Sequence, residues 1–125
     1  QIVMNRFLKS VGFAFSGLQL MLQEPNFRIQ LVAAVLVICT SFFLHITSTE
    51  WIILIGCIGM VMAAEVFNTA VEQLCNMTEP NIHPLIKKIK DTSAAAVLIL
   101  ALVAAICGSI VLLPKIIFTI QMYVS

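Results

Sequence analysis

Residues 51–75 read WIILIGCIGMVMAAEVFNTAVEQLC, an apolar run that admits carboxylates only in its second half. The first fourteen residues carry no charge, and Glu65, Asn68 and Glu72 then follow at helical spacing. The intervals i, i+3 and i+7 place these three side chains on one face of an α-helix. A run of this length and apolarity is typical of a membrane-spanning helix. Its polar face predicts a site in or beside the membrane.

Two further stretches are long enough to cross a bilayer. Residues 29–49, IQLVAAVLVICTSFFLHITST, and residues 92–114, TSAAAVLILALVAAICGSIVLLP, contain no Lys, Arg, Asp or Glu. Twenty-one helical residues extend about 31 Å, which matches a hydrocarbon core of about 30 Å. We therefore predict an all-α membrane protein, one membrane domain over residues 1–125, with spans at 28–48, 51–75 and 92–114.

The composition excludes several classes of protein. The chain is 61% hydrophobic and 10% charged, with a mean hydropathy of +1.07. A 125-residue soluble core could not hide so much apolar surface, so lipid must serve as part of the solvent. The net charge of +1 is too small for a protein that binds nucleic acid by releasing counterions.

The segment before the first span differs from the spans. Residues 2–23 mix Arg6 and Lys9 with many apolar side chains, a composition that favours an amphipathic helix lying in the membrane interface. Pro25 predicts a break before the first span. At the other end of the chain, residues 114–125 (PKIIFTIQMYVS) are expected to form an interfacial tail.

The basic residues predict the orientation. Six of the seven lie before or at the start of the first span or in 76–91, which we expect to be a cytoplasmic loop, and only Lys115 follows the third span. Lys and Arg are concentrated in cytoplasmic loops, so the N-terminus is predicted to be cytoplasmic.

The depth of the carboxylates indicates a site at the cytoplasmic boundary of the membrane. Glu65 lies about 21 Å along the helix from Trp51, and Glu72 lies about 10 Å further. Hydrogen bonding between helices would explain Asn68. It would not explain Glu65 and Glu72, because such bonding needs no ionisable groups. Glu24, just before the first span, is expected near the depth of Glu72. Two carboxylates with water access suit Mg²⁺, which prefers oxygen ligands and keeps several waters.

The loop at 76–91 carries three lysines, which either hold phosphates or attract anionic lipid. We favour lipid attraction for Lys87 and Lys88, whereas Lys90 and Asp91 project toward the level of Glu72.

The sequence contains no G-x-x-x-x-G-K-[ST] motif, so any phosphoryl transfer must use another scaffold. A small proton- or cation-coupled transporter, or a helper that only oligomerises, stays an alternative at this point.

Four motifs resemble those of the small bacterial diacylglycerol kinases, over about residues 6–113. Residues 65–72, EVFNTAVE, match the signature E-x-x-N-[ST]-A-[IV]-E, and residues 90–97, KDTSAAAV, resemble K-D-x-x-[AS]-[AG]-A-V. Residues 24–28, EPNFR, resemble E-x-N-F-R, and residues 83–85, HPL, resemble the H-P loop.

This resemblance implies a homotrimer in the bacterial cytoplasmic membrane that shares its active sites between subunits and transfers the γ-phosphate of MgATP to a lipid alcohol. It implies that Glu65 is the general base, that Glu24 and Glu72 bind the metal, and that Asn68 lies beside the reacting groups. The nucleotide would be contacted by Asn81, Ile82, His83, Lys90 and Asp91. On the N-terminal helix, Arg6 and Phe13 would contact lipid or nucleotide; we assign Arg6 to the lipid substrate and Phe13 to the nucleotide.

Two matters stay open. Asn76 stands where many relatives have Asp, so one negative charge near the phosphates is lost. The acceptor alcohol is also not fixed, because diacylglycerol and undecaprenol both have a primary hydroxyl and an apolar tail. We favour diacylglycerol slightly.

Overall fold

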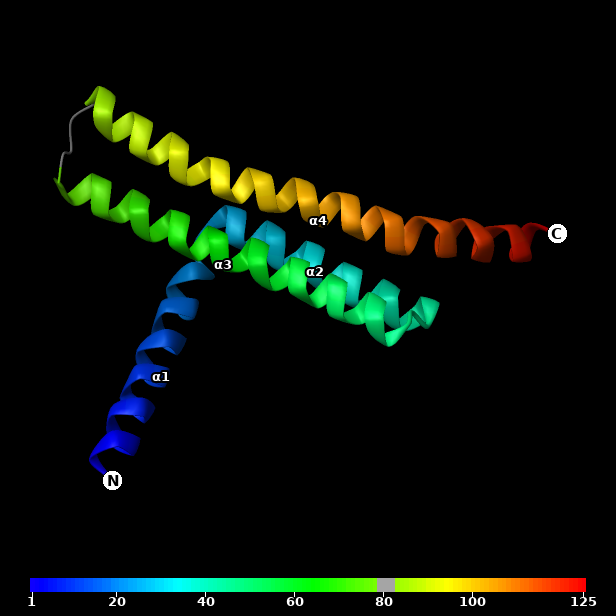
Figure 1. Ribbon diagram of the computed structural model, residues 1–125, viewed down its shortest axis with the longest axis horizontal. Helices are drawn as coiled ribbons and strands as arrows, with labels where there is room; N and C mark the ends of the chain where they lie inside the picture. The colour runs from blue at the N-terminus through cyan, green and yellow to red at the C-terminus, as the bar shows by residue number, and fades with distance from the viewer. Residues whose placement is uncertain (79–82) are drawn as a thin grey trace.

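The computed structural model describes residues 1–78 and 83–125, and within these ranges the chain forms four α-helices (Figure 1). They are, in chain order, α1 (Ile2–Met21), α2 (Pro25–Leu44), α3 (Ser48–Thr78) and α4 (Pro84–Val124). The last three are long and apolar enough to cross a membrane. The prediction of an all-α protein with three candidate membrane spans is therefore confirmed, but the first of these helices ends at Leu44 and not at residue 48.

Local sequence signals set the ends of α2 and the start of α3. Pro25 occupies the first turn of α2, where its missing N–H leaves no bond unmade. His45 ends α2 in the left-handed region, at φ 53°. Thr47 and Glu50 then form a reciprocal cap, in which the Thr47 N–H donates to the Glu50 carboxylate at 2.9 Å and the Glu50 N–H donates to the Thr47 hydroxyl at 3.2 Å. The turn between the two spans is thus only a few residues long.

The segment predicted as a loop, 76–91, is helical at both of its ends in the structure. Residues 76–78 complete α3, and α4 begins at Pro84. His83 caps α4 because its Nδ1 accepts the N–H of Leu85 at 3.1 Å, and Pro84 suits the first helical position. The prolines that we read as loop residues therefore include one that starts a helix.

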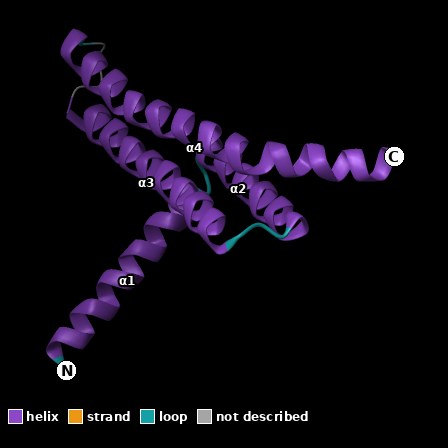
Figure 2. Cartoon of the chain, turned by 45° about the vertical axis from the view of Figure 1, so that its right-hand side comes forward, coloured by secondary structure: helices purple, strands orange, loops and turns teal. Residues whose placement is uncertain are grey.

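The C-terminal residues, expected to form an interfacial tail, continue α4 to Val124. Pro114 lies inside this helix, where it lacks an N–H to donate to the preceding turn. Figure 2 shows α4 changing direction along its length, and a proline is the usual cause of such a bend. At about 1.5 Å per residue, α4 is about 61 Å long, twice the thickness of a hydrocarbon core of about 30 Å.

Helices α2, α3 and α4 form one bundle, and α3 and α4 make the most extensive contact (Figure 1). We call the end where α2 begins and α3 ends the inner end, and the opposite end the outer end. At the outer end Ile46, Leu54 and Val111 form a buried apolar cluster. Beside it the rings of Phe42 and Trp51 lie 4.8 Å apart. The core of a single chain is therefore small, and most apolar side chains face outward.

Helix α1 projects away from the bundle and meets it only near its C-terminal end (Figure 1). Met21 is its one buried residue. Leu18 and Leu20 are exposed, as are Phe7 and Phe13. The placement of this helix along a membrane interface stays a prediction.

Replacing Leu54, which is 3% exposed, by Ala tests the outer cluster. The free energy of unfolding in detergent micelles should fall by about 2–5 kcal/mol, because the change removes buried methyl groups and leaves a cavity. The matched control is Leu102→Ala, since Leu102 is 55% exposed on α4. Equal loss of stability in both variants would show that Leu54 is not part of a packed core.

Candidate functional site

A buried carboxylate lies inside the bundle. Glu65 of α3 is 5% exposed, and its Oε2 accepts a hydrogen bond from Nε2 of Gln30 on α2 at 3.2 Å. A carboxylate in apolar surroundings needs a hydrogen-bond partner, and the amide supplies one. This polar contact joins α2 to α3 in the inner half of the bundle.

The predicted polar face of α3 is observed one turn further toward the inner end. Asn68 is 6% exposed, and its Nδ2 donates to Oε1 of Glu72 at 3.3 Å. Thr69 beside it is buried, whereas Glu72 is partly exposed. The acidic groups thus pass from an enclosed position at Glu65 to a more accessible one at Glu72.

Two buried amide oxygen atoms, one on α2 and one on α3, have no hydrogen-bond partner among the described residues. They are Oε1 of Gln30 and Oδ1 of Asn68. Nearly all buried polar atoms in proteins are paired, and an unpaired one costs free energy. Each oxygen therefore keeps an unused capacity to accept a hydrogen bond.

Two apolar grooves are lined by residues next to Glu65 in the sequence or bonded to it, although Glu65 itself lines neither. One, of about 280 Å³, lies between α2, α3 and α4 and has Gln30 at its inner end; its other lining residues include Ala33, Ala34, Met62, Ala101, Ala104 and Ala105. The second, of about 350 Å³, lies between α3 and α4 and includes Asn68 and Ser93. Both are lined largely by small or apolar side chains, so they suit hydrocarbon rather than polar ligands.

A larger groove, of about 590 Å³, lies at the outer end, away from these carboxylates. It is lined by Phe43, His45, Lys115, Phe118 and Tyr123, among others. Lys115 is already paired with Glu50, at 3.3 Å. A functional site chosen by groove volume alone would be this one, but Glu65, Asn68 and Glu72 lie in the inner half of the bundle.

Glu24 caps the start of α2 and is partly buried, and its side chain makes no capping hydrogen bond. Within residues 1–78 and 83–125, no hydrogen bond or ion pair joins it to Glu72. The same ranges contain no group of three His, Cys, Asp or Glu side chains that could hold a metal ion. The donors present still fit Mg²⁺, because this ion is commonly held by one or two carboxylates together with waters and substrate phosphates.

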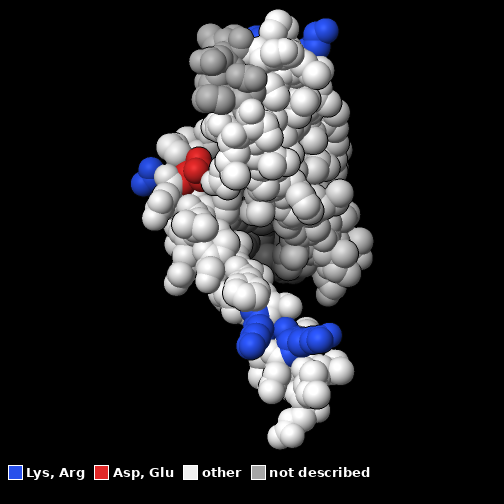
Figure 3. Space-filling view, turned by 90° about the vertical axis from the view of Figure 1, so that its left-hand side faces the viewer, with Lys and Arg blue, Asp and Glu red and all other residues white. Residues whose placement is uncertain are grey.

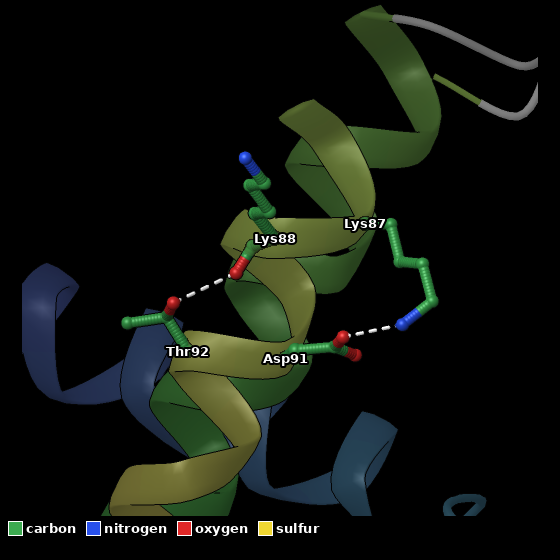
Figure 4. Close-up of polar contacts among 4 residues, drawn as sticks. All are labelled: Lys87, Lys88, Asp91 and Thr92. Atoms are coloured by element: carbon green, nitrogen blue, oxygen red, sulfur yellow. Dashed lines mark hydrogen bonds and ion pairs between the residues drawn. The ribbon is translucent and has the colours of Figure 1, made fainter. Parts of the chain in front are cut away.

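The charged groups at the start of α4 have partners of their own. Figure 4 shows the Lys87 ammonium bonded to the Asp91 carboxylate one turn later, with both side chains more than 60% exposed. The Lys90 ammonium instead donates across to Oδ1 of Asn76 on α3. Asn76 lies one helical turn beyond Glu72 toward the inner end, so the Lys90 ammonium lies at that level. Its partner is the amide of Asn76 and not a carboxylate.

The remaining predicted residues are not brought to this face. Arg6 and Phe13 lie exposed on α1, and His83 caps α4 at an exposed position. In the space-filling view, acidic side chains lie near the C-terminal end of α1, and the basic side chains of α1 lie closer to its N-terminal end (Figure 3). Asn81 and Ile82 fall outside the described residues.

Gln30 was not among the predicted site residues, although the sequence held a signal for it. It is the only strongly polar side chain between Ile29 and Cys39, in a segment otherwise made of apolar residues. A polar side chain at that depth needs a partner, but only the packing of α2 on α3 shows that the partner is Glu65.

Comparison with known proteins gives consistent matches over nearly the whole chain. The family model described as prokaryotic diacylglycerol kinase matches residues 12–112. The chain is 34% identical over 113 residues to the undecaprenol kinase of Bacillus subtilis (strain 168), covering 90% of this chain and 92% of that protein. It is 32% identical over 109 residues to the diacylglycerol kinase of Escherichia coli (strain K12), covering 86% of this chain and 89% of that protein.

Proposed function

The chain belongs to the prokaryotic diacylglycerol kinase family and is a multi-pass lipid kinase, and from this premise we propose that its acceptor is diacylglycerol. The product would be phosphatidic acid. The observation that carries this proposal is the buried carboxylate of Glu65 beside an apolar groove. An apolar alcohol can reach such a carboxylate from the bilayer, and a weakly nucleophilic hydroxyl needs a positioned base.

The transfer step follows from the proposed roles. The hydroxyl proton of the alcohol passes to the carboxylate of Glu65, and the oxygen forms a bond to the γ-phosphorus of ATP. The bond between that phosphorus and the β–γ bridging oxygen breaks, and ADP leaves. Catalysis of this kind depends mainly on alignment and charge stabilisation.

The other residues would supply alignment and charge. Glu72 and Glu24 would hold Mg²⁺, which neutralises phosphate charge when it is bound. Lys90 would contact phosphate oxygens, since its ammonium is bonded to the amide of Asn76, which carries no charge. Asn68 and Arg6 would contact the alcohol. The nucleotide contacts would be completed by Phe13, Asn81, Ile82, His83 and Asp91.

The proposed setting is the bacterial cytoplasmic membrane, with the N-terminus and the acidic face of α3 on the cytoplasmic side, where ATP is present. A homotrimer with shared sites would bring further residues to Glu72.

A second acceptor, undecaprenol, is supported by one specific observation. The relative in Bacillus subtilis carries the name undecaprenol kinase and aligns with 90% of this chain. The transporter alternative, in contrast, finds no support among the matched proteins.

The acceptor is tested by reconstituting the purified protein with labelled ATP, Mg²⁺ and one alcohol at a time. Diacylglycerol should give the higher kcat/KM. A higher kcat/KM for undecaprenol would replace the proposed acceptor, and labelling of neither lipid would contradict the proposed function.

Glu65→Gln should lower kcat by about 100-fold or more, because an amide cannot accept the hydroxyl proton. Binding of MgATP, measured by calorimetry, should persist. Glu50→Gln makes the same chemical change at the outer end and should leave kcat near that of the wild type. A Glu65→Gln variant with near-normal turnover would remove Glu65 from the role of base.

Glu72→Gln should raise the Mg²⁺ concentration required for half-maximal activity, because a metal ligand loses its charge. Titration of activity with Mg²⁺ at saturating ATP measures this directly. An unchanged Mg²⁺ dependence would show that the metal is held elsewhere.

A further inference from the structure

We propose that the groove of about 590 Å³ at the outer end, between the end of α2 and the last part of α4, binds an anionic phospholipid of the leaflet at that end, with the phosphate at Lys115. The family model matches residues 12–112, and the part of α4 that lines this groove begins at Pro114. The α4 side of the groove therefore lies beyond the matched residues, and the inference goes beyond the proposed kinase reaction.

The position of Lys115 along α4 carries the first step. Asp91 and Lys115 are consecutive charged residues of this helix, because residues 92–114 contain no Asp, Glu, Lys or Arg. The helix between them extends about 36 Å, slightly more than a hydrocarbon core of about 30 Å. Trp51 lies at the same end, beside Phe42, and tryptophan is enriched at membrane–water interfaces. Lys115 is thus expected at the depth of the lipid headgroups.

The lining of the groove carries the second step, because it combines the two kinds of surface that a phospholipid needs. Lys115 and His45 supply polar groups, and the rings of Phe43 and Phe118 supply apolar surface. Both rings are more than 60% exposed in the chain, so a lipid can reach them. A charged phosphate suits the polar groups, and the hydrocarbon beside it suits the rings.

The charge of the lining favours an anion. Lys115 brings a positive charge, and none of the residues that line the groove is Asp or Glu. The Lys115 ammonium lies 3.3 Å from Oε1 of Glu50, and this contact uses one of its three N–H donors. The same oxygen accepts the N–H of Thr47 at 2.9 Å, which holds the carboxylate at the start of α3. The Lys115 side chain is 33% exposed, so its other two donors are available to a phosphate.

The last part of α4 favours a lipid over a free anion as the occupant. Figure 1 shows α4 continuing beyond the ends of α2 and α3. In this part Ile117, Phe118 and Ile120 are each more than 50% exposed. Apolar side chains of this kind are unfavourable in water and favourable among lipids, and Pro114 allows the helix to bend toward the membrane surface.

Trp51 provides a direct probe, because the chain contains one tryptophan. Trp51 and Leu44 pack on the same buried cluster, and Leu44 lines the groove. The purified full chain is reconstituted in phosphatidylcholine bilayers that contain brominated phosphatidylglycerol or brominated phosphatidylcholine, since bromine quenches nearby tryptophan. The anionic lipid should bind beside Trp51 about fivefold better, which is the attraction between one basic residue and an anionic lipid surface.

Lys115→Gln removes the charge and should make the two lipids bind equally well. Lys115→Arg keeps the charge and should keep the preference, which separates the effect of charge from a loss of folding. The matched control is Lys88→Gln, the same change near the inner end of α4, and it should leave the preference at Trp51 unchanged.

The groove itself is tested by Thr119→Phe, which fills it while Lys115 stays in place. This variant should lose the preference for the anionic lipid. Ile120→Phe adds a ring at an exposed position outside the lining and should keep the preference. A Thr119→Phe protein that keeps the preference would show that the charge acts without the groove, and this would overturn the inference.

Three other results would also overturn it. The first is equal quenching of the wild type by the two brominated lipids. The second is a preference that survives Lys115→Gln or that is lost equally in Lys88→Gln, because the charge at the groove would then not be its cause. The third is quenching by neither lipid, which would show that something other than lipid covers the outer end. None of these outcomes depends on the kinase reaction.

Discussion

The hydrogen bond between Gln30 and Glu65 satisfies the constraint on which the rest of the site depends. A carboxylate in the middle of an apolar bundle is costly unless a polar group meets it, and here the partner comes from the neighbouring helix. This contact fixes the position of α2 against α3 at one depth. It also leaves Oε1 of Gln30 without a hydrogen-bond partner in the part of the chain that the structure describes.

From that point the polar groups on α3 become more accessible toward the inner end. Glu65 is enclosed, Asn68 bonds to a partly exposed Glu72, and Lys90 of α4 reaches Asn76 one turn further. This order suits a reaction that joins a bilayer-soluble alcohol to a water-soluble nucleotide, because the apolar reactant meets the deep end and the charged reactant meets the shallow end. The larger outer groove has a more polar lining, which includes His45 and Lys115, and its lining contains no acidic side chain.

The sequence predicted the spans and the polar face of α3, because apolar runs and helical spacing are local properties. It also predicted the break at Pro25. It did not predict that α4 begins at Pro84, since a proline reads equally well as a loop residue and as the first residue of a helix. The partners of Gln30 and Lys90 could not be predicted, because both contacts join different helices and depend on how these pack. The roles of Glu24, His83 and Arg6 stay predictions, since a single chain does not bring them to Glu65.

The central claim is that the acceptor hydroxyl lies beside Glu65, at the inner end of the groove. It is tested most directly with a lipid alcohol that carries a photoreactive diazirine on the carbon next to its hydroxyl. After irradiation of the wild-type protein in bilayers, mass spectrometry of its peptides should place the label around Gln30 of α2 and around Met62 and Glu65 of α3. Label confined to the outer groove, around Phe43 and Phe118, would contradict the account.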